Sequence, residues 1–198
     1  MSKKQPFDRR EFLKTAAAVA GVAGLPSFAF AQGAKIRVGL MLPYTGTYAQ
    51  LGVAITNGFK LAVAESGGKF GGRDIEYFTV DDEMNPAKAT DNANKLVTRD
   101  KVDVLVGTVH SGVEMGIVKV VRESGTLHIN PNAGLAAATG ALCAPNIFRT
   151  SFANSQTTYP MGKVLADRGV KSVVTLTWKY AAGDEMVEGF KDGFAKGK

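Results

Sequence analysis

The stretch "VDVLVGTVHSGVEMGIVKVVRESGTLHIN" (residues 102–130) contains one complete strand–helix–strand unit. It opens on the continuous apolar run of residues 102–107, which is typical of a strand covered on both faces. A helical pattern follows over about residues 112–123, and "TLHIN" (126–130) reads as a second, short strand. Two strands joined through a helix lie parallel in one sheet, so this stretch predicts an α/β fold.

The same alternation extends over the chain from Lys35 onward. Strand patterns cover residues 35–42, 73–82 and 171–178, and helical patterns cover residues 49–66, about 85–99, about 156–168 and from about 183 onward. Asn85 and Pro86 suit the N-cap and first turn of their helix. One apolar helical face is expected at Leu51, Ile55, Phe59 and Val63. The pattern predicts an open parallel sheet with helices on both faces.

The alternation breaks off within a repeat, because no strand pattern follows the last helix before Lys198. We therefore expect a fragment of a two-lobed protein. Residues 35–150 would form a first, ligand-binding lobe, and residues 151–198 would begin a second lobe that is incomplete.

The N-terminal segment is typical of an export signal. "DRREFLK" (8–14) has paired arginines, and a short Ala/Gly-rich apolar run follows and ends in small residues. This pattern predicts a twin-arginine signal peptide over residues 1–31, with cleavage after Ala31 and a periplasmic location. The run is too short and too weakly apolar for a membrane span.

Charge, cysteine content and acidic residues exclude several kinds of partner, namely nucleic acid, a disulfide within the chain and a metal ion. Residues 1–31 hold five of the 24 Lys/Arg and two of the 18 Asp/Glu, so much of the net charge of +6 lies in the signal segment. Since no basic block with interleaved aromatic residues remains, nucleic acid is not expected as a partner. Cys143 is the single cysteine and cannot form a disulfide within the chain. The acidic triplet 81–83 lacks a second ligand set, so no metal or cofactor is predicted.

Ligands of open parallel sheets bind at the carboxyl ends of the strands. The loops expected there are "PYTGTYAQ" (43–50), "TVHSG" (108–112), "NPNAG" (130–134) and "KYAAG" (179–183). Their polar and aromatic side chains make a small-molecule cleft, and the candidates from these loops include Tyr48, His110, Asn132 and Tyr180.

Ser111 lies where a strand passes into a helix, and two interpretations of it compete. With Glu114 it fits the capping box S-x-x-E, which predicts a helix cap whose N-terminus also holds a ligand carboxylate. A secreted serine hydrolase using Ser111 is the alternative from another class. The hydrolase pattern G-x-S-x-G fails, however, because residue 109 is Val, and His128 falls within a strand pattern.

The exported chain resembles the periplasmic solute-binding proteins of ABC importers in the leucine/isoleucine/valine-binding family. The motifs that carry the resemblance are "IRVGLMLPYTGTYAQLG" (36–52), "HSG" (110–112), "INPNAG" (129–134), "NIFRTSF" (146–152) and "AAGDEMVEGFKDGF" (181–194), together with residues 67–107. The resemblance implies the type I periplasmic-binding-protein fold, in which two α/β lobes close on a ligand.

The resemblance also implies roles for individual residues. Ser111 matches the serine that holds the ligand carboxylate, and Ala133 and Gly134 match a segment that assists it, with Gly134 in place of a threonine. Leu51 stands where amino-acid binders often have an aromatic residue, for which Tyr48 is a substitute, and Ala182 stands where a tyrosine is frequent.

The function implied is capture of a branched-chain amino acid or related small carboxylate in the periplasm for an ABC permease in the inner membrane. A non-catalytic monomer is expected. Phrases such as "CAPNIFRTSF" (143–152) and "TWKYAAG" (177–183) favour the aromatic-carboxylate branch of the same family as an alternative. A ligand-sensing domain of a signalling protein is a third interpretation.

Overall fold

The structure is a computed structural model that describes residues 34–197. The predicted signal peptide, residues 1–31, lies outside the described residues. Residues 35–197 belong to one unit, which alternates strands with helices as expected. Its strands are β1 (Ile36–Leu42), β2 (Lys69–Phe70), β3 (Arg73–Asp81), β4 (Val104–Val106), β5 (Leu127–Asn130) and β6 (Ile147–Arg149). Its helices are α2 (Ala49–Glu65), α3 (Pro86–Asn94), the π-helical turn η1 (Lys95–Arg99), α4 (Ser111–Ser124), α5 (Ala136–Thr139), α6 (Asn154–Asp167) and α7 (Ala181–Ala195).

The strands form one sheet in the order β2-β3-β1-β4-β5-β6. Every neighbouring pair from β3 to β6 is parallel, and only the two-residue β2 runs antiparallel to β3. The carboxyl ends of β1, β4 and β5 therefore lie at the same edge of the sheet, and the loops that follow them meet there. The predicted open parallel sheet is confirmed.

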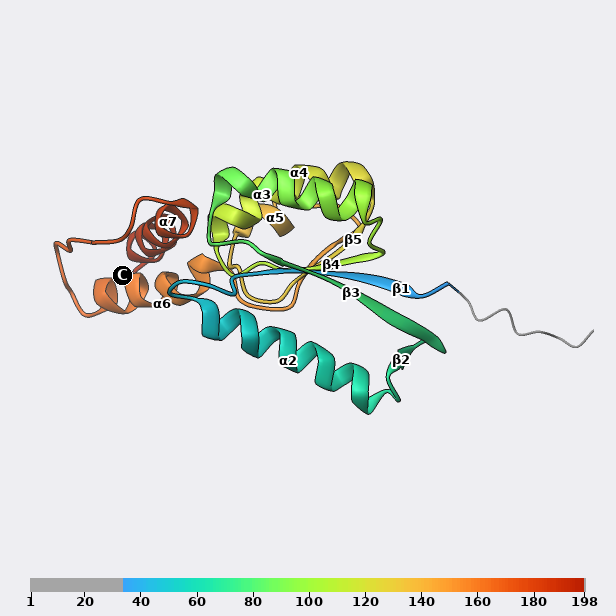
Figure 1. The fold of residues 1–198 in the computed structure, drawn as a ribbon. Helices are drawn as coiled ribbons and strands as arrows, with labels where there is room; N and C mark the ends of the chain where they lie inside the picture. The colour runs from blue at the N-terminus through green and yellow to red at the C-terminus, as the bar shows by residue number, and fades with distance from the viewer. Residues whose placement is uncertain (1–33, 198) are drawn as a thin grey trace, which may run out of the picture. The chain divides into compact units, whose positions relative to one another are not determined.

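Helices cover both faces of this sheet (Figure 1). On one face, Val38, Leu40 and Val106 are buried and pack with Phe59 of α2. On the other face, Met41 and Leu105 belong to the larger apolar core beneath α3 and α4. Alternate residues of β1 thus point to opposite cores, as the pleat of a strand requires.

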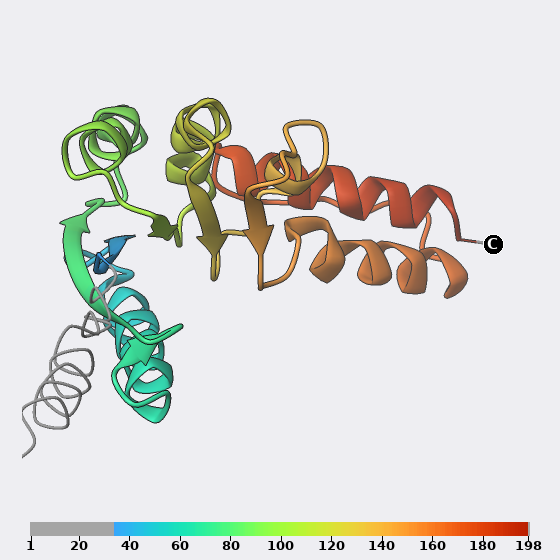
Figure 2. The same cartoon turned by 90° about the vertical axis from the view of Figure 1, so that its right-hand side faces the viewer.

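Helices α6 and α7 pack against each other beyond β6 and run in the same direction, because residues 168–180 return along them (Figure 2). Glycines in the contact explain the close packing. A Cβ built on Gly193 would lie 1.9 Å from the carbonyl oxygen of Tyr159, and one built on Gly162 would lie 2.2 Å from that of Phe190. The glycines of "EGFKDGF" (188–194) therefore let the two backbones approach.

Several expectations from the sequence are wrong in detail. Residues 171–178 form no strand, because no neighbouring strand pairs with them among the described residues. Of the predicted apolar face of α2, Val63 is buried and Phe59 packs against the core, but Leu51 is 42% exposed. Gly52 and Thr56 are buried as well, so the face is only partly as predicted. The N-cap at Asn85 is confirmed, since its side chain accepts from the backbone N–H groups of Ala87 and Lys88.

No helix among residues 34–197 has the length and apolar content that crossing a bilayer requires.

Candidate ligand-binding cleft

A cleft of about 530 Å³ opens where the loop after β1 and the loop after β4 meet the segment before α7. It is lined by Thr47, Tyr48, Met84, His110, Trp178, Lys179 and Tyr180. Three of the predicted ligand residues, Tyr48, His110 and Tyr180, are thus brought together. The volume is in the range of small-molecule sites, and the lining combines aromatic surface with a few polar groups.

The rings of His110 and Tyr180 stack with centroids 4.7 Å apart and planes 22° apart. Burial lowers the pKa of His110, which favours the neutral imidazole. Its Nδ1 accepts a hydrogen bond from the backbone N–H of Gly112 at 3.1 Å, which leaves the proton on Nε2. Burial, and then the neighbouring Tyr48 with its hydrogen bond, raise the pKa of Tyr180. The two rings therefore form an uncharged aromatic wall, that is, one aromatic side of the cleft.

Ser111 is the first residue of α4, not its cap. The N-cap is His110, whose ring nitrogen takes the place that a serine oxygen was expected to fill. Ser111 is only 3% exposed, and its Oγ accepts a hydrogen bond of 3.2 Å from Asn154 Nδ2. The predicted capping box is wrong, because Glu114 turns into the core instead of back to the start of the helix.

Glu114 forms a buried network below the start of α4. Its Oε1 lies 3.0 Å from His128 Nε2, and its Oε2 accepts from Thr108 Oγ1 at 3.2 Å. The other ring nitrogen of His128 bonds to the carbonyl oxygen of Leu105. Neither His110 nor His128 forms a hydrogen bond with Ser111 Oγ, so within residues 34–197 no histidine is placed as the base of a serine nucleophile.

The loop after β5 is held rigidly beside the loop after β4. The amide of the buried Asn130 donates to the carbonyl oxygen of Ala133 at 2.8 Å and accepts from the backbone N–H of Asn132 at 3.1 Å. The backbone N–H of Ala133 donates to the carbonyl oxygen of Thr108 at 3.0 Å. Ala133 and Gly134 are both buried, and Asn132 is partly buried.

Two residues that the sequence did not single out join this region. Asn154, the first residue of α6, contacts both Ser111 and Gly134. Glu185 of α7 accepts from the backbone N–H of Ala136 at 2.9 Å and from Asn154 Nδ2 at 2.7 Å. A polar residue at the start of a helix looks like an ordinary cap in a sequence, so no local signal marks these long-range contacts.

Other predicted or polar positions lie apart from the cleft. The predicted ligand residues that do not line it are Leu51, Ser111, Asn132, Ala133 and Gly134. Ser111 directly follows His110, which does line it. Asp81, in the acidic triplet, accepts from the backbone N–H of Tyr44 and from that of Glu83, and so closes a turn. Within residues 34–197, no cluster of side chains is suited to holding a metal ion.

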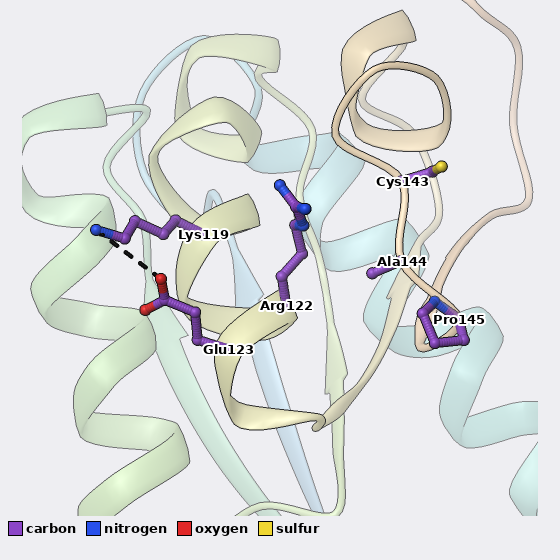
Figure 3. Close-up of a pocket in the computed structure, with 6 residues that line it drawn as sticks. All are labelled: Lys119, Arg122, Glu123, Cys143, Ala144 and Pro145. Carbon is purple, nitrogen blue, oxygen red and sulfur yellow. Dashed lines mark ion pairs between the residues drawn. The ribbon is translucent and has the colours of Figure 1, made fainter.

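A second hollow, of about 390 Å³, lies between the C-terminal half of α4 and the loop before β6 (Figure 3). Its lining includes Lys119, Glu123 and the exposed Cys143, and the lysine ammonium is 3.9 Å from the Glu123 carboxylate. None of the predicted ligand residues lies in it. The cleft at the carboxyl ends of the strands therefore remains the candidate site.

An open parallel sheet with a ligand-sized cleft at its carboxyl edge is the architecture of a small-molecule-binding α/β protein. The model of the family described as "Periplasmic binding protein" matches residues 35–197, and the chain belongs to this family. A twin-arginine translocation signal matches residues 6–26. The chain is an exported, periplasmic protein, as the sequence predicted.

Three relatives place the chain within the family. The "Leu/Ile/Val-binding protein homolog 6" of Brucella abortus is 28% identical over 80% of this chain. A solute-binding protein of an ABC transporter from R. palustris, solved in complex with benzoate, is 55% identical over 83% of this chain, with a TM-score of 0.76. A solute-binding protein from Rhodopseudomonas palustris BisB5, in complex with 3,4-dihydroxybenzoic acid, is 31% identical over 82% of this chain, with a TM-score of 0.72.

The chain spans less than half of each relative: 40% of the Brucella protein, 46% of the benzoate-bound chain and 44% of the dihydroxybenzoate-bound one. These relatives are binding proteins by name, not enzymes.

Proposed function

We propose that the protein is the solute receptor of an ABC importer and that its ligand is an aromatic carboxylate of the benzoate class. The observation that carries the proposal is the 55% identity, over 83% of this chain, to a solute-binding protein in complex with benzoate. This choice favours the aromatic-acid alternative over a branched-chain amino acid.

The lining of the cleft supports a ligand that has a carboxylate and a flat apolar body. The stacked pair His110 and Tyr180, with Trp178, offers aromatic surface to a ring. Lys179 adds a positive charge, and none of the described lining residues is acidic.

Ser111 and the N-terminus of α4 would take the carboxylate. The first backbone N–H groups of a helix have no partner within the helix, and the helix dipole favours an anion there. The rigid backbone of Ala133 and Gly134 would flank it, as the resemblance implies. In this proposal, residues 35–150 form the first lobe and residues 151–198 begin the second.

Transport would follow from lobe closure. A ligand that contacts both lobes stabilises the closed state, and the closed form is what a permease of the inner membrane would recognise. The receptor would act as a monomer, without a cofactor and without turnover.

The test is isothermal titration calorimetry on the full gene product with its signal removed, using benzoate, 4-hydroxybenzoate and leucine in parallel. We expect the two aromatic acids to bind and leucine to bind at least about tenfold more weakly, a difference of about 1.4 kcal/mol. Tight binding of leucine alone would restore the amino-acid assignment. Covalent labelling of Ser111 by a serine-directed phosphonate would instead support the hydrolase.

A further inference from the structure

Asn154 connects three parts of the fold that are far apart in the sequence. It is 2% exposed, and its backbone N–H donates to the carbonyl oxygen of Gly134 at 2.8 Å. Its side-chain Nδ2 donates to Ser111 Oγ at 3.2 Å and to Glu185 Oε2 at 2.7 Å. One amide group thus connects Ser111 at the start of α4 with Glu185 of α7.

Glu185 determines which way this amide points. An ionised carboxylate only accepts hydrogen bonds, so the Asn154 atom that faces it must be the Nδ2 donor. The same carboxylate accepts from the backbone N–H of Ala136 at 2.9 Å and, more weakly, from that of Ala137 at 3.4 Å. With its position fixed by these contacts, Glu185 prevents the Asn154 amide from turning over.

The orientation of the amide has a consequence for Ser111. A hydroxyl group has one hydrogen to donate and lone pairs that accept. Because Asn154 donates to Ser111 Oγ, the hydroxyl hydrogen of Ser111 is not used in this contact, and among residues 34–197 Ser111 Oγ is seen only as an acceptor. A ligand carboxylate, which only accepts, is the partner that this arrangement suits.

Gly134 makes room for the arrangement. A Cβ built on Gly134 would lie 2.2 Å from Asn154 Oδ1 and 2.8 Å from its Cγ. At position 134 the resemblance implies a threonine, but here the Asn154 side chain occupies the space that a threonine side chain would need. The Asn154 side chain can take this position only because residue 134 is glycine.

We propose that Asn154, held by Glu185, is a positioning residue that orients the Ser111 hydroxyl as a donor toward the ligand carboxylate. This inference rests on the proposed function. It adds that selectivity for a carboxylate depends on a residue outside the lining of the cleft and on a contact between α6 and α7.

The test is a double-mutant cycle in benzoate affinity on the full gene product. Asn154→Ala should weaken binding about 3-fold to 30-fold, whereas in the Ser111→Ala background the same change should have almost no effect, because the hydroxyl it orients is gone. Asn154→Asp should weaken binding further, since its carboxylate would accept the Ser111 hydrogen and repel the ligand.

Two further variants separate positioning from folding. Asn146→Ala is the matched control, because its amide also bridges two groups, the carbonyl oxygens of Val121 and Thr126, but lies away from the cleft. It should lower the melting temperature and leave affinity unchanged. Glu185→Gln leaves Asn154 in place and should still weaken binding about threefold, because a neutral amide no longer fixes the orientation.

The outcomes are distinguishable. If the unaltered protein binds none of the carboxylates tried, the proposed function fails, and this inference fails with it. If it binds benzoate but Asn154→Ala has the same effect with and without the Ser111 hydroxyl, only the positioning role is overturned. Should Asn154→Ala fail to fold, unchanged affinity of Glu185→Gln would overturn the role independently.

Discussion

Glu114 and His128 form an ion pair in the interior of the protein, with His128 Nε2 3.0 Å from Glu114 Oε1 and both side chains fully buried. Burial disfavours the charged imidazole, but the Glu114 carboxylate and the hydrogen bonds to Glu114 and Leu105 outweigh it and raise the pKa of His128 above 6.5. The pair links β5 to α4 three residues beyond Ser111, so it supports the helix on which the site is built.

Thermal and urea stability should therefore decline on the alkaline side. A base whose pKa is raised in the folded state contributes its full stabilisation below pH 6.5 and loses it as the pH rises through the folded-state value. Glu114→Gln should lower the free energy of unfolding by about 3–5 kcal/mol in the acidic range, since it removes one partner of a buried pair. Urea titrations between about pH 5.5 and 9 measure both effects.

The exposed pair Lys163 and Asp167 provides the control, because a solvated ion pair contributes about 0–1 kcal/mol. Lys163→Gln should leave the pH profile unchanged. A Glu114→Gln profile with the same alkaline decline as the unaltered protein would assign that decline to another group.

Ser111→Ala should weaken benzoate binding by about 1–3 kcal/mol, the range for a hydrogen bond to a charged group that is lost. Calorimetry measures the change directly. Ser124→Ala, at the other end of the same helix, removes a hydroxyl that bonds only locally and should leave affinity unchanged. Equal affinities of the Ser111→Ala and unaltered proteins would place the carboxylate elsewhere.

His110 should be replaceable as a helix cap by another side-chain acceptor. His110→Ala should cost about 1 kcal/mol of folding free energy, because the hydrogen bond to the backbone N–H of Gly112 is lost. His110→Asn should restore most of that stability but not the ring stacked on Tyr180. Chemical denaturation of both variants, with benzoate titrations beside it, separates the cap from the aromatic wall. Loss of equal stability in the two variants would argue against capping.

Gly134→Thr, which installs the residue that the resemblance implies, should destabilise the protein by about 1–3 kcal/mol through overpacking against Asn154. Truncating the neighbour should relieve part of this cost, because the Asn154 side-chain atoms lie closest to the added Cβ. The comparison is the melting temperature of Gly134→Thr alone against Gly134→Thr with Asn154→Ala. A double variant less stable than the sum of the singles would contradict the steric pairing.

Periodicity predicted the sheet, because hydrophobic alternation and turn residues are local features that each segment carries by itself. It did not reveal β6, whose three residues include one buried position, Ile147, and an exposed Phe148. The cap of α4 was assigned to Ser111 because S-x-x-E is a local motif, whereas Glu114 is drawn away by His128, fourteen residues downstream. Contacts such as Asn154 with Ser111, 43 residues apart, leave no local pattern to read.

The segment between α6 and α7, residues 168–180, exposes apolar side chains that affect the solubility of the purified chain. Val174, Leu176 and Trp178 are 92%, 98% and 81% exposed, and they alternate with threonines along an extended backbone. An apolar, β-prone edge that carries no partner is a template for pairing between molecules. A molecule in which this segment stays uncovered should self-associate as its concentration rises. Charged substitutions at Leu176 or Trp178 should keep it in solution without disturbing the cores on either side of the sheet.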